Sequence, residues 1–140
     1  MTKIATGYLG DIYQVKKFTK LVLKVTKEIK KFHKKQPFDA IAFTGTSGAA
    51  LAYPLSAKLG IPLICIRRGQ NHFKEAIEGF VGAKTYIIID DFIETGATID
   101  RIIKKVKTNS KAIPVAIFLY TAKGTLNTKT WNDIPVIRIK

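Results

Sequence analysis

The sequence predicts an α/β domain in which a twisted parallel sheet is flanked by helices. Short apolar segments alternate along the chain with segments of helical periodicity. The continuous apolar run 86–89 is typical of a strand that is buried on both faces, as strands of parallel sheets are. The chain has 140 residues, of which 46% are hydrophobic, and this suffices for a single domain, 1–140, with a substantial core.

The first expected element is an amphipathic helix over 15–35, which Pro37 ends. Apolar residues recur there at spacings of three and four on one side, and lysines follow the same period on the opposite side. The stretch contains nine lysines, at positions 16, 17, 20, 24, 27, 30, 31, 34 and 35. We interpret them as a solvated face, because no arginine among them offers a forked base contact and no aromatic residue is interleaved for stacking.

Strands and helices then alternate along the rest of the chain. Strands are expected over 38–43, 61–66, 86–89, 115–120 and, at an edge of the sheet, 135–139. Helices are expected over 49–59 and 99–106. Pro54 either delays the start of the first of these two helices or kinks it.

Three loops are expected at the same edge of the sheet. Ligands of parallel α/β sheets bind at the carboxyl ends of the strands, where the segments 44–48 and 90–98 fall. The polar stretch 67–82 is long for a compact domain, so we expect it to form a mobile functional loop at this edge as well.

The segment 90–98 carries the clearest chemistry. Two acids, Asp90 and Asp91, end a buried strand, and Thr-Gly-Ala-Thr then opens a helix at 95–98. A helix N-terminus offers unpaired N–H groups and the positive end of the helix dipole, so this turn fits a phosphate, although such a turn can also simply cap a helix. Carboxylates accept hydrogen bonds from sugar hydroxyls or neighbour a divalent metal. The two features together fit a ribose 5-phosphate.

Residues 86–98 resemble the phosphoribosyl pyrophosphate signature of type I phosphoribosyltransferases: an apolar strand, two acids, two apolar residues, one variable residue and Thr-Gly-x-Thr. The resemblance extends over roughly 38–120, and 50–68 is similar to adenine and orotate members. It implies a pentosyltransferase of nucleotide salvage that transfers 5-phosphoribose from phosphoribosyl pyrophosphate to a nucleobase and releases pyrophosphate. It also implies Mg²⁺ as cofactor, a homodimer, and a small hood over the base built from 1–16 and 121–140.

The same resemblance implies a role for each matching residue. Asp90 and Asp91 hold the ribose hydroxyls and lie near Mg²⁺, and they act in catalysis together with Glu94. The residues that wrap the 5-phosphate are Glu94, Thr95, Gly96, Ala97 and Thr98. The residues that bind pyrophosphate are Thr46, Ser47, Gly48, Arg67 and Arg68. The two arginines supply the positive charge that the loop 44–48 lacks.

For the acceptor base we expect a purine, with a 6-oxopurine slightly ahead of adenine. Glu94 stands at the variable position of the signature, where an acid of 6-oxopurine members is a candidate general base near N7; the alternative is an exposed loop residue. Lys123 is a candidate for contact with O6, or a surface lysine. Trp131 is a candidate for stacking on the base, or a plug in the core or an interface.

The net charge of +14 keeps a second class of function in view. A strongly basic surface attracts anions, so a regulatory, non-catalytic protein of this fold that binds a phosphoribosyl ligand and nucleic acid is the alternative. We favour the enzyme, because a pure binder has less need of both the acid pair and the phosphate loop.

The apolar runs are far shorter than the roughly 18–20 residues of a membrane span, and the N-terminus has no apolar signal segment, so a cytoplasmic protein is expected. The lone Cys65 rules out an intramolecular disulfide.

Overall fold

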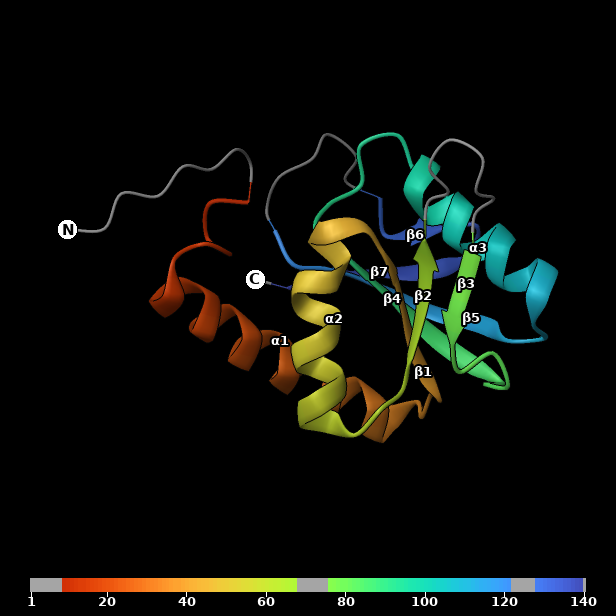
Figure 1. The fold of residues 1–140 in the computed structure, drawn as a ribbon, viewed down its shortest axis with the longest axis horizontal. Coiled ribbons are helices and arrows are strands. Elements are labelled where there is room, and N and C mark those ends of the chain that lie inside the picture. Colours follow the sequence, from red (N-terminus) through yellow and green to blue (C-terminus); the bar gives the residue numbers. More distant parts are fainter. Residues whose placement is uncertain (1–8, 68–75, 122–127, 140) are drawn as a thin grey trace.

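The computed structural model describes residues 9–67, 76–121 and 128–139. Within them a seven-stranded sheet has the order β3-β2-β1-β4-β5-β7-β6. The strands are β1 (Ala40–Thr44), β2 (Leu63–Arg67), β3 (Ala76–Gly79), β4 (Thr85–Asp90), β5 (Ile113–Leu119), β6 (Thr130–Trp131) and β7 (Ile134–Arg138). The helices are α1 (Val15–Lys35), α2 (Gly45–Leu59) and α3 (Ala97–Asn109). Figure 1 shows α1 and α2 on one face of the sheet and α3 on the other, so the expected α/β architecture is confirmed.

The five central strands are parallel, and the short strands β3 and β6 pair antiparallel with their neighbours at the two edges. Thr44 at the end of β1 is in register with Ile66 of β2, and Asp90 at the end of β4 is in register with Leu119 of β5. Because parallel strands end at the same edge, the sheet presents these carboxyl ends side by side.

Each face of the sheet has its own hydrophobic core. Side chains alternate along β4, so Ile87 and Ile89 pack under α1 and α2, whereas Ile88 packs under α3 with Ile99 and Ile102. This alternation between two covered faces explains why the run 86–89 is apolar at every position. Burying one such side chain completely contributes about 1.5–3 kcal/mol to stability.

The helix α1 begins and ends where the periodicity predicts. Val22, Val25 and Ile29 on its apolar side are buried, and all nine lysines on the other side are exposed. The N–H of Gln36 still donates to the carbonyl of Phe32 at 2.8 Å, and the chain then leaves the helix. Within the described ranges, none of the helices combines the length and apolar character that crossing a bilayer requires.

The segment 44–48 differs from the expectation, because it is not a free loop. The helix α2 begins at Gly45, directly after β1, and continues through Pro54 to Leu59 without interruption. The first turn of α2 lies against the sheet, where a Cβ at position 48 would stand 2.9 Å from the Cβ of Phe43. Only glycine permits this approach, so packing against the sheet rather than local propensity sets where the helix begins.

The stretch 67–82 also contains structure that its polar composition conceals. The strand β3 returns antiparallel along β2, with Ile77 opposite Ile66 and packed against the core under α3. The prediction of a loop over 76–79 was therefore wrong. Residues 68–75, between the two strands, lie outside the described residues.

Candidate active site

The two adjacent acids are fixed by the backbone of the sheet. The N–H of Tyr120 donates to the carbonyl of Asp90 at 3.2 Å, and the N–H of Thr121 donates to the carbonyl of Asp91 at 3.1 Å. The pairing of β4 with β5 thus continues through both acids. Their side chains are only 5% and 6% exposed, which is rare for carboxylates and shows that the fold holds two acids in a sheltered position.

The carboxyl group of Asp90 is electrostatically strained. Its Oδ1 accepts hydrogen bonds from the hydroxyl of Ser47 at 3.0 Å and from the N–H of Asp91 at 2.9 Å. Burial, and after it the neighbouring charge of Asp91, nevertheless raise the pKa of Asp90 to about 7. Ionising both carboxyl groups therefore costs free energy, which a bound cation would offset.

The loop that follows the acids leads into the first turn of α3. Gly96 immediately precedes the helix with a φ of +86° and, being a glycine, has no side chain to cap it. The hydroxyl of Thr95 accepts a hydrogen bond from the N–H of Ala97 at 3.2 Å. The N–H of Asp100 makes the first hydrogen bond within the helix, to the carbonyl of Gly96, at 2.9 Å. The N–H groups between these positions belong to the open first turn, where a helix binds anions.

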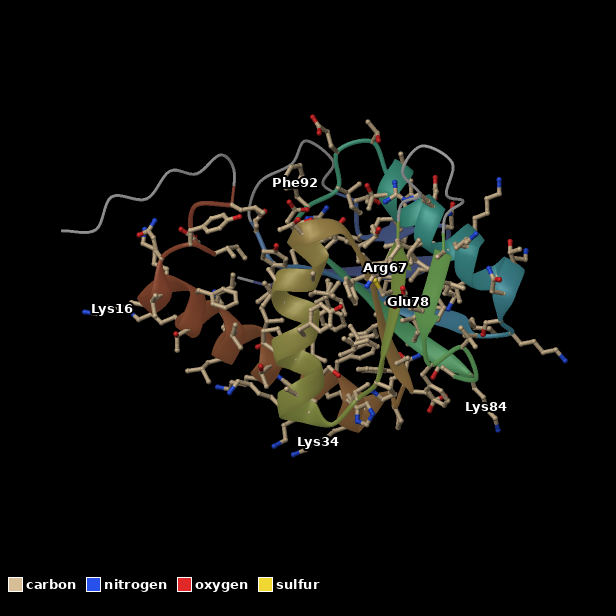
Figure 2. All side chains as sticks on the ribbon, in the orientation of Figure 1. Lys16, Lys34, Arg67, Glu78, Lys84 and Phe92 are labelled. Carbon is tan, nitrogen blue, oxygen red and sulfur yellow. The ribbon has the colours of Figure 1, made fainter. Side chains whose placement is uncertain are left out.

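A pocket of about 410 Å³ joins this loop to the start of α2. Ser47 comes from α2, and the other lining residues come from the segment after β4. The full lining is Ser47, Asp91, Phe92, Ile93, Glu94, Thr95, Gly96, Thr98 and Ile99. Figure 2 shows Phe92 at the end of the molecule where α2 begins. The pocket thus brings together residues to which the family resemblance assigns ribose, the 5-phosphate and pyrophosphate.

The residues expected to bind pyrophosphate occupy the first turn of α2. Thr46 is exposed there, Ser47 is half-buried and Gly48 is buried against the sheet. The hydroxyl of Tyr120 donates to the carbonyl of Ser47 at 2.6 Å, which fastens this turn to the end of β5. The turn is uncapped, so it offers a second helix N-terminus to an anion, close to the first.

One of the two expected arginines is engaged with an acid. The Nε of Arg67 lies 2.8 Å from Oε1 of Glu78 on β3, and Figure 2 shows the two side chains next to each other. Both side chains are more than half exposed, so the pair is weak and free to exchange for another anion. Arg68 lies outside the described residues.

Sequence reasoning missed a third arginine. The Nη2 of Arg101, one turn into α3, donates to the hydroxyl of Thr44 at 3.2 Å, and that hydroxyl donates to the carbonyl of Ile66 at 2.6 Å. Thr44 is 4% exposed and directly precedes α2. A cation from α3 therefore lies beside the start of α2. The sequence carried only a weak signal for it, an arginine one helical turn after the phosphate loop.

Of the residues proposed for the base, Glu94 is exposed and lines the pocket. Lys123 lies outside the described residues. Trp131 is half-buried, packs against Gly96 and donates its indole N–H to Oδ1 of Asp100 at 2.7 Å. Among the described residues, Trp131 does not belong to the lining of the pocket.

Comparison with known proteins places this geometry in a family. The PRTase-CE family matches residues 4–132, nearly the whole chain. The chain belongs to the PRTase-CE family. No curated protein sequence matches it.

Solved structures confirm the fold of this PRTase-CE chain. An adenine phosphoribosyltransferase from Thermoanaerobacter pseudethanolicus matches with a TM-score of 0.67 and 19% identity, over 92% of this chain and 83% of that one. An orotate phosphoribosyltransferase from Francisella tularensis matches with a TM-score of 0.68 and 14% identity, over 91% and 68%. UMP synthase from Leishmania donovani matches with a TM-score of 0.64 and 25% identity, over 85% and 26%. The fold is that of the type I phosphoribosyltransferases, and family and fold together identify a transferase.

The donor atoms of the PRTase-CE chain fit Mg²⁺. Mg²⁺ prefers oxygen ligands, keeps several waters and is usually held by one or two carboxylates together with substrate phosphates. Asp90 and Asp91 provide such a pair, and the raised pKa of Asp90 shows that a positive charge would be favourable there. Among the residues that the structure describes, no group of three or more His, Cys, Asp or Glu side chains forms a closed metal site.

Proposed function

We propose that this chain transfers 5-phosphoribose from phosphoribosyl pyrophosphate to a nucleobase and releases pyrophosphate. The observation that carries the proposal is the pocket in which Asp91, the first turn of α3 and Ser47 of α2 face one space. The starts of α2 and α3 each offer open N–H groups to an anion, and the buried carboxylate pair lies at the end of β4 in the same site. This arrangement suits a sugar that bears a phosphate at one end and a diphosphate at the other.

The transfer breaks the bond between C1 of the ribose and the diphosphate oxygen, and it forms a bond between C1 and a nitrogen of the base. Asp90 and Asp91 accept hydrogen bonds from the ribose hydroxyls, and their charge favours the positive charge that develops on the sugar ring. The electron pair of the broken bond leaves with pyrophosphate. The proton displaced from the base nitrogen passes to a carboxylate or to water.

Pyrophosphate is assigned to the start of α2. The first-turn N–H groups and the Ser47 hydroxyl donate hydrogen bonds, and Arg101 lies at Thr44, just before the turn. Arg67 and Arg68 remain proposed as further cations from the end of β2. When bound, Mg²⁺ supplies positive charge that stabilises the leaving diphosphate. The proposed Mg²⁺ residues are Asp90 and Asp91.

For the acceptor base we propose a purine, and Glu94 carries this assignment. Its carboxylate is exposed and lines the pocket, where it is available to take the proton from a purine nitrogen. The replacement Glu94→Gln keeps the shape of the side chain and removes its basicity. We expect it to lower kcat far more than it raises KM for the donor. Lys123 stays proposed as the contact to a base carbonyl, whereas the contacts of Trp131 favour the role argued below.

A panel of bases tests the function and the base class together. The purified protein is incubated with phosphoribosyl pyrophosphate, Mg²⁺ and either guanine, hypoxanthine, adenine, uracil or orotate, and pyrophosphate release is measured. Release that depends on a purine supports the proposal, with Asp91→Asn as the inactive control. Release only with orotate or uracil would overturn the purine assignment, and release with none would overturn transfer to these bases.

The exposed lysines of α1 favour a second candidate function, binding of nucleic acid. Nine exposed lysines lie on this one helix, whose only acid is Glu28. They offer charge without base readout, so any such binding would be insensitive to sequence and would weaken steeply with salt. Titration of a fluorescent DNA duplex at increasing NaCl tests it, with the replacement of four α1 lysines by glutamine as the comparison.

A further inference from the structure

The phosphate loop touches a part of the chain that the signature does not include. A Cβ at position 96 would lie 2.1 Å from Cζ2 and 2.2 Å from Cη2 of Trp131. The six-membered ring of the indole therefore occupies the place that any side chain at 96 would take. Glycine is therefore favoured at position 96 for two reasons: its backbone has a positive φ, and the indole of Trp131 leaves no room for a side chain.

The other end of the same indole is tied to the helix that follows the loop. The Nε1–H of Trp131 donates to Oδ1 of Asp100 at 2.7 Å, and Nδ2 of Asn132 donates to the same oxygen at 3.3 Å. Asp100 lies in the first turn of α3, where a carboxylate competes with a bound phosphate for the positive end of the helix. The two donors on the hairpin hold this carboxylate and offset part of its charge.

The hairpin that carries Trp131 is itself well defined. Asn132 and Asp133 have φ values of 49° and 64°, the backbone of a two-residue turn of type I′ between β6 and β7. The strand β7 pairs with β5, which in turn pairs with β4. Trp131 is thus connected through the sheet to the strand that ends in the acid pair.

We propose that Trp131 is a positioning residue for the 5-phosphate loop. The indole fixes the backbone of Gly96 by contact and the first turn of α3 through Asp100, so the loop has its phosphate-binding shape before the donor arrives. This inference rests on the proposed function, and it replaces base stacking as the role of the tryptophan. Without the indole, the flexible backbone of Gly96 would have to be ordered when the phosphate binds, at a cost in conformational entropy. The contacts of Trp131 order this backbone beforehand, so binding no longer carries that entropy cost.

The direct test measures binding of ribose 5-phosphate, which has neither base nor diphosphate. Isothermal calorimetry compares the wild type with Trp131→Phe, which keeps a ring over Gly96 and loses the N–H, and with Trp131→Leu, which loses both. We expect Trp131→Phe to weaken binding roughly three- to tenfold, the scale of immobilising one further group on binding, and Trp131→Leu to weaken it further. KM for phosphoribosyl pyrophosphate should rise in parallel, while kcat and the ratios of rates among bases stay unchanged.

A double-mutant cycle isolates the hydrogen bond. In the background of Asp100→Ala the acceptor is absent, so Trp131→Phe should have no further effect on ribose 5-phosphate affinity. Asp100→Asn keeps an oxygen acceptor, so in this background Trp131→Phe should still weaken the binding of ribose 5-phosphate by most of the factor seen in the wild type. The matched control is Asn132→Gly, which keeps the turn and removes only the longer hydrogen bond at 3.3 Å; we expect a smaller loss than for Trp131→Phe.

Three results would overturn the inference. The first is unchanged affinity for ribose 5-phosphate in folded Trp131→Phe and Trp131→Leu proteins, and the second is no binding of this probe to the wild type. The third is a change in base selectivity without a change in that affinity, which would support stacking of Trp131 on the base. If Trp131→Leu unfolds, Trp131→Phe decides. If the wild type binds ribose 5-phosphate and the variants lose affinity, but no base supports turnover, the proposed function fails and the positioning role stands.

Discussion

The starts of α2 and α3 are the two turns proposed to bind anions, and they are held in place by different means. The first turn of α2 follows β1 directly and is locked by packing, with Gly48 against Phe43 and a hydrogen bond from Tyr120. The first turn of α3 follows a loop after Asp91 and is held by a side chain from a distant hairpin.

The two turns also differ in charge. The first turn of α2 contains no acid and has Arg101 beside it, whereas α3 has Asp100 in its first turn and follows three other acids, Asp90, Asp91 and Glu94. The more positive turn suits the more highly charged group, a diphosphate. The turn among acids suits a phosphate attached to a sugar whose hydroxyls the carboxylates can bind. The difference teaches that two helix starts with the same open N–H groups can differ in the charge around them, and this charge is what assigns the diphosphate to α2 and the 5-phosphate to α3 in our proposal.

The largest effect is expected from removing the charge between the two turns. The double replacement of Asp90→Asn and Asp91→Asn should lower turnover by at least about 10²–10³-fold, the scale for losing electrostatic stabilisation of a transition state. The fold should survive, because both side chains are repelled by each other and buried at a cost. Steady-state assays and thermal melting measure the two properties. Near-normal turnover in the folded double variant would make the acids structural.

Arg101 tests whether the start of α2 is the diphosphate end. We expect Arg101→Gln to weaken inhibition by pyrophosphate and to raise KM for the donor by roughly ten- to a hundredfold, since a hydrogen bond to a charged group contributes about 1.5–3 kcal/mol. Binding of ribose 5-phosphate should be unaffected. Arg67→Gln is the matched control, and its effect should be smaller because Arg67 is exposed and already paired with Glu78. Equal effects of the two replacements would remove the special role of Arg101.

Gly48→Ala tests the packing that holds the start of α2. The added Cβ meets the Cβ of Phe43 at 2.9 Å and the carbonyl oxygen of Ile89 at 3.3 Å, so the helix must shift away from the sheet. Overpacking of this kind costs about 1–3 kcal/mol of stability. We expect lower stability in urea denaturation and weaker inhibition by pyrophosphate, with unchanged affinity for ribose 5-phosphate. An equal loss of both ligands would show that the two turns move together.

A dependence of stability on pH is expected from Asp90, the last residue of β4. Because the pKa of Asp90 is raised to about 7 in the folded protein, the folded state holds a proton that the unfolded state has lost. The contribution of this group is therefore fully present below its unfolded pKa of about 4 and is lost as pH rises through about 7, by at most about 1.4 kcal/mol per pH unit. Urea denaturation in metal-free buffer measures it. Asp90→Asn should abolish this slope, whereas Asp133→Asn, an exposed replacement of equal charge, should leave it.

The sequence was sufficient for those features that depend on local patterns. The helix over 15–35 and the strand around 86–89 follow from periodicity, because one has a single buried face and the other has two. The adjacency of Asp91 and Thr95–Thr98 in the chain also places them in one pocket. These features need no information about which elements pack together.

The features that sequence reasoning missed all depend on contacts between distant segments. The contact of Arg101 with Thr44 requires that α3 cross the face of the sheet above β1. The contact of Trp131 with Gly96 requires a strand of only two residues, β6, which is too short for a periodic pattern. The early start of α2 depends on the packing of Gly48, which only the neighbouring strands reveal.

The contact between Gly96 and Trp131 also constrains how this sequence can change over generations. A larger residue at 96 collides with the indole, so a lineage that first replaces the glycine passes through an impaired intermediate. A lineage that first replaces the tryptophan with a smaller residue removes the collision and leaves only the strain of a positive φ. The two substitutions are therefore epistatic, because the steric cost of a side chain at 96 depends on which residue occupies position 131.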